Sequence, residues 1–145
     1  MANTVLKANN ISIVFGGLKA VDDFCIEIKE GELVGLIGPN GAGKTTVFNM
    51  LTGVYVPTSG TVELCGKDVT NLSPHKRVDL GIARTFQNIR LFKRMSVLEN
   101  VKVCSNIHMN YSMFDGIFKT KKYFEQEDKA TEEAMEILKV LGLEE

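Results

Sequence analysis

The alternation of apolar and polar residues predicts a small antiparallel β-sheet in the N-terminal part of the chain. Residues 5–15 and 24–29 place apolar side chains at alternating positions, and residues 61–64 repeat this alternation. A period of two is typical of strands that have one buried and one solvated face. Gly16-Gly17 lies between the first two segments and predicts a turn. We therefore expect residues 61–64 to join the sheet that the first two strands form.

Two other short segments predict strands of a different kind. Residues 33–37 form an uninterrupted apolar run, which is typical of a strand covered on both faces of a parallel sheet. Residues 82–86 predict a second short strand. Between the two segments, apolar residues recur at helical spacing from Val47, and Gly53 is placed to end that helix. The order of these elements predicts an α/β fold.

Helix-start signals predict further helices along the chain. Ser73-Pro74 is typical of an N-cap followed by the first helical position, and Gly81 follows at a distance that suits a short helix. Ser96 and Glu99 have the spacing of a capping box, in which the two residues satisfy each other's backbone N–H groups. We therefore expect one helix to begin near residue 74 and another near residue 97.

The C-terminal third of the chain is predicted to end in one more helix. Residues 110–128 mix polar and aromatic residues and predict a loop, with a turn at Asp115-Gly116. From Glu127 onward, apolar residues recur at helical spacing, and Gly142 is placed to end the helix. The stripe comprises Ala130, Ala134, Ile137, Leu138 and Leu141. Such a stripe predicts a packing face rather than a ligand site.

The candidate chemistry lies directly after the apolar run at residues 33–37. The segment matches the pattern G-x-x-x-x-G-K-[ST] and consists of Gly38, Pro39, Asn40, Gly41, Ala42, Gly43, Lys44, Thr45 and Thr46. Glycines allow the backbone to wrap closely around phosphate oxygens, and the helix that follows directs its N–H groups and its positive dipole end at the same anion. The lysine can reach the β and γ phosphates, and the Thr45 hydroxyl can complete the ligand shell of a Mg²⁺ ion. The motif therefore predicts a nucleoside triphosphate site.

Composition narrows the class of protein. With 145 residues, 44% of them hydrophobic and 24% charged, the chain is large enough for a domain with a real core. A net charge of −1 argues against a broad nucleic-acid-binding surface. No signal peptide or membrane-spanning segment is expected from the sequence, so any membrane role would be peripheral.

The motifs together resemble one family, the ATP-binding subunits of ABC transporters. The resemblance rests on GPNGAGKTT at 38–46, on Phe-Gly-Gly-Leu-Lys-Ala-Val at 15–21 and on Arg-Thr-Phe-Gln at 84–87. The sequences of residues 86–92 and 108–128 are similar to those of the ATP-binding subunits of branched-chain amino-acid importers. The resemblance implies a P-loop NTPase (ABC ATPase) fold. In such a fold an N-terminal antiparallel β subdomain is followed by the start of a parallel core sheet and part of a helical subdomain.

This resemblance also implies roles for individual residues. Phe15 lies where the family stacks an aromatic ring on adenine, although a core aromatic on the face of Ile11 and Ile13 is an equally weighted alternative. Val21 would pack nearby. Gln87 resembles the glutamine that contacts the Mg²⁺ ion and the attacking water, and it would act in catalysis together with Lys44. The implied cofactors are ATP and Mg²⁺.

The resemblance further implies partners and domain boundaries. The expected partners are transmembrane permease subunits, a second ATP-binding subunit and, indirectly, a substrate-binding protein, at the cytoplasmic face of the plasma membrane. Residues 1–95 correspond to the N-terminal part of the ATP-binding core and 96–145 to a partial helical subdomain. The family's signature motif and acidic Walker B strand would follow residue 145. We therefore expect an incomplete cassette that does not hydrolyse ATP by itself.

Two alternatives share the phosphate-binding motif. One is a soluble ABC-type ATPase outside transport, which would usually bring a second cassette or a coiled-coil insertion. The other is a small P-loop kinase or GTPase, which would need acceptor-binding residues or an Asn-Lys-x-Asp motif. The sequence contains no such guanine motif.

Overall fold

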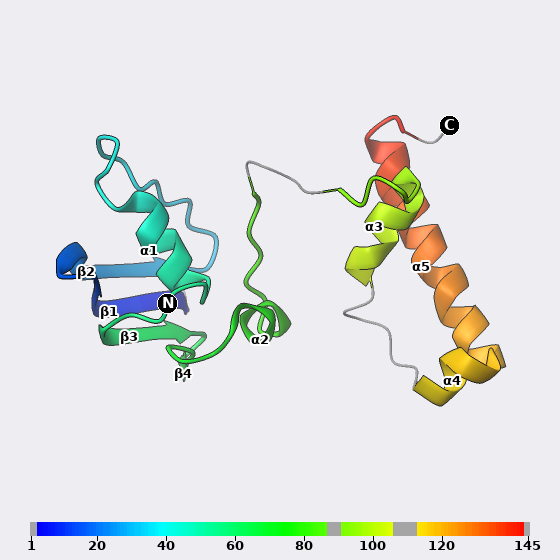
Figure 1. Cartoon of the computed structure of the whole chain (residues 1–145), viewed down its shortest axis with the longest axis horizontal. Helices are drawn as coiled ribbons and strands as arrows, with labels where there is room; N and C mark the ends of the chain where they lie inside the picture. The colour runs from blue at the N-terminus through cyan, green and yellow to red at the C-terminus, as the bar shows by residue number, and fades with distance from the viewer. Residues whose placement is uncertain (1–2, 87–90, 106–112, 144–145) are drawn as a thin grey trace. The chain divides into compact units, whose positions relative to one another are not determined.

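The computed structural model describes residues 3–86, 91–105 and 113–143 (Figure 1). The chain forms two compact units, Met1–Thr85 and Phe86–Glu145. The first unit contains four strands and two helices, and the second contains three helices within the described residues. Each unit is described by itself below.

The first unit is built on the predicted antiparallel sheet. Its strands are β1 (Thr4–Phe15), β2 (Leu18–Lys29), β3 (Ser59–Leu64) and β4 (Lys67–Asp68), in the order β2-β1-β3-β4. All neighbouring pairs are antiparallel. The turn at Gly16-Gly17 and the return of β3 to the N-terminal sheet are therefore both confirmed.

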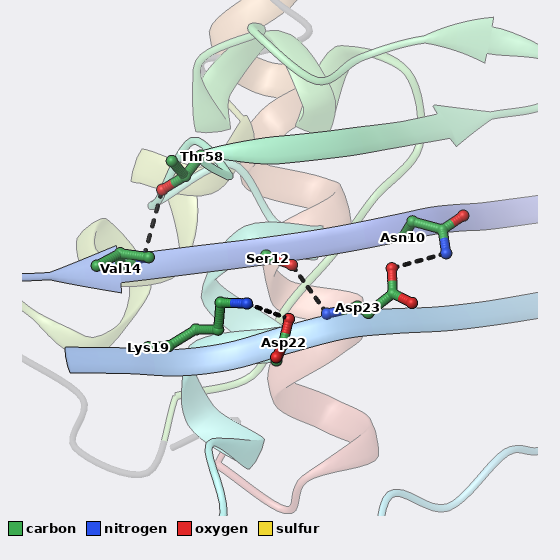
Figure 2. A network of polar contacts seen from close by, with 7 residues as sticks. All are labelled: Asn10, Ser12, Val14, Lys19, Asp22, Asp23 and Thr58. Carbon is green, nitrogen blue, oxygen red and sulfur yellow. Dashed lines mark hydrogen bonds and ion pairs between the residues drawn. The ribbon is translucent and has the colours of Figure 1, made fainter. Parts of the chain in front are cut away.

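The pairing of β1 with β2 contains bulges that polar side chains hold in place (Figure 2). Asn10 and Asp23 have positive φ angles of 49° and 53°, a conformation that Asn and Asp tolerate better than most residues. The Asn10 side-chain amide donates to Asp23 Oδ1 at 2.7 Å, and the Asp23 backbone N–H donates to Ser12 Oγ at 2.8 Å. A side-chain ion pair between Lys19 and Asp22 lies beside them. These contacts fix the register of the two strands where the regular ladder is interrupted.

Helix α1 (Lys44–Leu51) supplies the other half of the core in this unit. It buries Val47, Met50 and Leu51, as its helical spacing predicts. They join a cluster with residues of three strands and of the connection after β4, namely Ala8, Ile11, Ile13, Val21, Val62, Leu64 and Val69. The helix ends as expected before Gly53, which has φ 80° and donates its N–H to the Met50 carbonyl. The helix that follows the glycine loop is thus anchored on the sheet by its apolar face.

A buried arginine donates hydrogen bonds to carbonyls at the C-terminal end of α1. Arg77 lies in the short helix α2 (Pro74–Asp79), and its side chain is fully buried. Its guanidinium donates to four carbonyls, those of Met50, Leu51, Thr70 and Leu72, at 2.8–3.1 Å. Burial lowers the pKa of Arg77 from its ordinary value, and the Asp68 carboxylate opposes that shift. The positive charge therefore sits at the C-terminal end of α1, where helix carbonyls need donors and the dipole favours a cation.

The strands expected at 33–37 and 82–86 are wrong: neither segment is a strand in the structure. Leu33 and Ile37 are almost fully exposed, whereas Leu36 and Ile82 do pack against the core cluster. A strand requires a neighbour that accepts and donates along its edge. The described strands pair only as β2-β1-β3-β4, and none of them pairs with either segment. An apolar run predicts burial, but it does not supply the hydrogen-bonding partner.

The second unit consists of helices α3 (Val97–Ser105), α4 (Met113–Phe118) and α5 (Lys121–Val140) within its described residues. The predicted capping box at the start of α3 is confirmed. The Ser96 N–H donates to Glu99 Oε2 at 2.7 Å, and the Glu99 N–H donates to Ser96 Oγ at 3.2 Å. An ion pair of 2.9 Å between Lys102 and Glu127 joins α3 to α5.

Helix α5 begins earlier than the apolar stripe predicts. Residues 110–112 of the loop expected at 110–128 lie outside the described residues. For the described part, the loop and its turn at Asp115-Gly116 are wrong, because Asp115 and Gly116 lie in α4 and α5 starts at Lys121. Thr120 separates the two helices, and its hydroxyl donates to Asp115 Oδ1 at 2.9 Å.

The packing face of α5 is narrower than the sequence stripe. Ala130, Ala134 and Leu138 are buried, while Ile137 and Leu141 are exposed. The helix ends where predicted: Gly142 has φ 67°, and the Leu143 N–H donates to the Leu138 carbonyl at 2.9 Å. Among the described helices, none is both long and apolar enough to cross a membrane.

Candidate functional site

The glycine-rich loop enters α1 through two residues with left-handed backbone conformations. Gly41 has φ 84°, and Gly43, the N-cap of α1, has φ 80°. Few other residues adopt these angles without strain. The loop therefore reaches the helix with the backbone geometry that the motif predicts.

Gly43 is also required by a close approach to the sheet. A Cβ atom at this position would lie 2.7 Å from the Ala20 carbonyl oxygen and 3.2 Å from Val21 Cγ2. Val21 is buried in the core of the sheet, opposite Ile13 of β1. The Ala20 carbonyl and the Val21 side chain thus leave no room for a side chain at the N-cap of α1.

The loop borders a cavity of about 400 Å³. Its walls are two segments of the first unit, residues 18–20 of β2 and residues 40–46 of the loop and α1. The first N–H groups of a helix have no acceptor within the helix, and the first three residues of α1, Lys44, Thr45 and Thr46, line this cavity. A cavity lined by backbone donors at a helix N-terminus is suited to an anion.

Lys44 is the first residue of α1, and its ammonium group lies over the loop. The Nζ atom donates to the carbonyls of Gly38 and Pro39, both at 2.7 Å. The cation is therefore held at the loop by backbone oxygens rather than by a carboxylate. A phosphate oxygen is a stronger acceptor for an ammonium group than a neutral carbonyl, so a polyphosphate in the cavity can compete for it.

Thr45 and Thr46 complete the wall of the cavity. The Thr45 side chain is exposed, so its hydroxyl is available as an oxygen ligand for a hard cation such as Mg²⁺. The described residues contain no group of three or more His, Cys, Asp or Glu side chains that could hold a metal by themselves. The donor set fits a Mg²⁺ ion whose other ligands are phosphate oxygens and waters. Gln87, the other expected ligand, lies outside the described residues.

Phe15 ends β1 and is 43% exposed. It does not belong to the core cluster, although Ile11 and Ile13 of the same strand do. Val14 and Phe15, the last two residues of β1, are both exposed, so the buried part of this strand ends at Ile13. The alternative that Phe15 is a core aromatic is therefore wrong.

Sequence patterns did not indicate the arginine contacts at the other end of α1. Arg84 Nη1 donates to Asn49 Oδ1 at 2.7 Å and to Thr52 Oγ1 at 3.2 Å, and Arg77 donates to the last carbonyls of the helix. The Arg84-Thr85-Phe86-Gln87 motif marked Arg84 as part of a pattern without indicating a partner. The helix that presents Lys44 is thus held at its C-terminal end by two arginines from later in the chain.

Comparison with known proteins agrees with this geometry. Residues 21–145 match the family model described as ABC transporter. Over 145 residues the chain is 43% identical to the high-affinity branched-chain amino acid transport ATP-binding protein BraF of Pseudomonas aeruginosa, covering all of this chain and 57% of BraF. The corresponding protein LivG of Escherichia coli K12 is 41% identical over 143 residues, which are 99% of this chain and 56% of LivG. The chain thus spans little more than half the length of these relatives.

Solved structures lead to the same family. A nucleotide-free ATP-binding cassette from an ABC transporter matches 97% of this chain and 55% of its own length, with a TM-score of 0.74 and 37% identity. The ADP conformation of an ATP-binding cassette matches with a TM-score of 0.75 and 36% identity, covering 97% of this chain and 55% of that one. The glycine loop, the helix that follows it and the antiparallel sheet beneath them thus occur in a chain that belongs to the ABC transporter family of ATP-binding proteins.

Proposed function

We propose that this chain forms the nucleotide-binding part of an ATP-binding subunit that energises the import of branched-chain amino acids. The main observation behind this proposal is that the Lys44 ammonium group is held over the glycine loop at the N-terminus of α1. A cavity lined by residues 40–46 lies beside it. The names of relatives that match the whole chain, BraF and LivG, support the choice of transported substrate.

In this proposal the loop binds the phosphates of ATP. The backbone N–H groups of residues 41–46 donate to the phosphate oxygens, and Lys44 leaves the carbonyls of Gly38 and Pro39 to reach the β and γ phosphates. Phosphoryl transfer depends mainly on positioning and on neutralising negative charge, and both tasks suit these groups. The Thr45 hydroxyl would hold a Mg²⁺ ion, which supplies further charge neutralisation when bound. Gln87 would contact the same ion and the attacking water.

The adenine base would stack on Phe15, with Val21 packed behind the loop. Stacking needs only a flat apolar face, and the Phe15 ring is partly open to solvent. Phe15 pairs with Leu18 across the hairpin turn, and Leu18 lines the cavity, so the hairpin that carries the ring borders the cavity.

The partners follow from the same proposal. The subunit would act at the cytoplasmic face of the plasma membrane as a peripheral protein, with transmembrane permease subunits, a second ATP-binding subunit and, indirectly, a substrate-binding protein. No role in nucleic-acid binding is proposed. The residues that line the cavity include no carboxylate that could activate the attacking water, so we expect this chain to bind ATP without hydrolysing it.

The test is the affinity of the purified chain for ATP, measured by equilibrium dialysis with radiolabelled nucleotide. Lys44→Ala should weaken binding by about one to two decades, because a hydrogen bond to a charged group contributes about 1.5–3 kcal/mol. Lys67→Ala, which removes an exposed lysine from β4, is the matched control and should bind as the parent does. A Lys44→Ala protein with the parent's affinity would refute the proposal.

A further inference from the structure

A second aromatic residue, Tyr55, lies against the Phe15 ring. The ring centroids are 5.3 Å apart and the planes meet at 69°, so the edge of one ring faces the other. This arrangement is favoured because the positive edge of one aromatic ring attracts the negative face of another. Both rings are partly exposed, and neither belongs to the core cluster. The pair therefore forms an aromatic surface rather than part of the interior.

The backbone around Tyr55 is bound to α1 at one end and to β1 at the other. The Tyr55 N–H donates to the carbonyl of Asn49, in the last turn of α1, at 3.0 Å. Three residues later, the Thr58 N–H donates to the Ser12 carbonyl at 2.8 Å, and Thr58 Oγ1 accepts the Val14 N–H at 3.3 Å (Figure 2). The short connection between α1 and β3 thus fixes Tyr55 relative to both elements.

Phe15 lacks such support from its own hairpin. The turn that follows it is Gly16-Gly17, and no atom lies within 4 Å of where a Cβ would stand at either glycine. Across this open turn Phe15 pairs with Leu18, whose side chain is 70% exposed. The ring contact with Tyr55 therefore joins the open end of the hairpin to a connection that α1 and β1 hold in place.

We propose that Tyr55 is a positioning residue that orients Phe15 for stacking on the base of a bound adenine nucleotide. The inference rests on the proposed function, since it concerns the same site. One end of α1 presents Lys44 and the loop to the phosphates, and the other end holds Tyr55. The helix thereby sets the distance between the phosphate site and the aromatic platform. A platform oriented before binding loses less side-chain freedom when the base arrives.

The test compares a ligand that has a base with one that has none. Tyr55→Leu should weaken ATP binding by about two- to tenfold, the range expected for an edge-to-face pair. Its effect on inorganic tripolyphosphate, measured as a competitor of radiolabelled ATP bound to the same site, should be below twofold. Tyr55→Phe keeps the ring and should bind both ligands as the parent does. Val54→Ala, an exposed neighbour in the same connection, is the matched control and should change neither affinity.

A double-substitution cycle adds a second readout. If Tyr55 acts through Phe15, adding Tyr55→Leu to Phe15→Leu should weaken ATP binding no further than Phe15→Leu alone. Equal losses for ATP and tripolyphosphate would show that Tyr55 only supports the fold, and an unchanged ATP affinity in Tyr55→Leu would also overturn the inference. Both outcomes leave the proposed function standing when Lys44→Ala still weakens the binding of both ligands by about one to two decades. A Lys44→Ala protein that binds normally would refute the proposed function itself.

Discussion

Arg77 offers a direct test of how α1, the helix after the glycine loop, is held. Arg77→Met replaces the buried guanidinium with an apolar side chain of similar length. The carbonyls of Leu51, Thr70 and Leu72 then lose this donor, whereas the Met50 carbonyl still accepts the Gly53 N–H at 3.2 Å. The substitution therefore separates the hydrogen bonds from the volume that Arg77 fills.

The magnitude follows from the groups that lose their donor. Each buried carbonyl without a donor costs about 1–3 kcal/mol, and three such groups would sum to several kcal/mol. Removing a buried charge returns part of that cost, because the Arg77 guanidinium is desolvated in the folded protein. We expect a net loss of about 3–5 kcal/mol, a large share of the roughly 5–15 kcal/mol by which a domain is stable.

The assay is urea unfolding followed by far-ultraviolet circular dichroism. Lys76→Met, an exposed neighbour on α2, is the matched control and should change the free energy of unfolding by less than about 0.5 kcal/mol. Arg77→Lys keeps the charge but loses the planar fork of donors, so it should fall between the parent and Arg77→Met. A loss below about 1 kcal/mol for Arg77→Met would refute the reasoning, because water or local rearrangement would then satisfy the carbonyls equally well.

Three further predictions concern other parts of the chain. The Ser96 N–H lowers the pKa of Glu99 below its ordinary 4.5, so this stabilisation is present above pH 4.5 and is lost as the pH falls through the lower folded value. Urea midpoints of Glu99→Gln should accordingly vary less between pH 6 and 3 than those of the parent, and parallel curves would contradict the capping role. The exposed Leu33 and Ile37 should drive self-association, so replacing both with Ser should reduce light scattering, whereas Val140→Ser, the control, should not. In a subunit that hydrolyses ATP, Gln87→Ala should keep nucleotide affinity and lower turnover, and lost affinity with normal turnover per bound nucleotide would oppose its catalytic role.

Features encoded by neighbouring residues could be predicted from the sequence. The strands β1 and β2 follow from their alternation, and the capping box at Ser96 and Glu99 depends on contacts three residues apart. The phosphate-binding loop belongs to the same class, because its glycines, lysine and helix start are contiguous. Each of these features depends on residues that are neighbours in the chain, so the sequence alone is enough to predict it.

Features that depend on distant partners could not be predicted. The run at 33–37 is apolar, yet it forms no strand, since pairing requires a neighbour that the run itself does not specify. In the sequence Arg77 is an ordinary residue of a short polar helix. Its role depends on two carbonyls of α1 that lie 26 and 27 positions away in the chain. Phe15 lies outside the core because the buried part of β1 ends at Ile13, and the alternation of residue types does not show where along a strand its cover ends.

The bulged strand β2 has a consequence for how this chain would aggregate. It lies at one edge of the sheet, and an exposed edge normally invites strand addition from another molecule. Here Asp22 and Asp23 place charge in the middle of that edge, and Asp23 has a left-handed backbone conformation. The edge is therefore charged and irregular, which disfavours pairing with an incoming strand. Clusters formed through Leu33 and Ile37 would therefore be amorphous rather than fibrillar, and they should scatter light without binding thioflavin T.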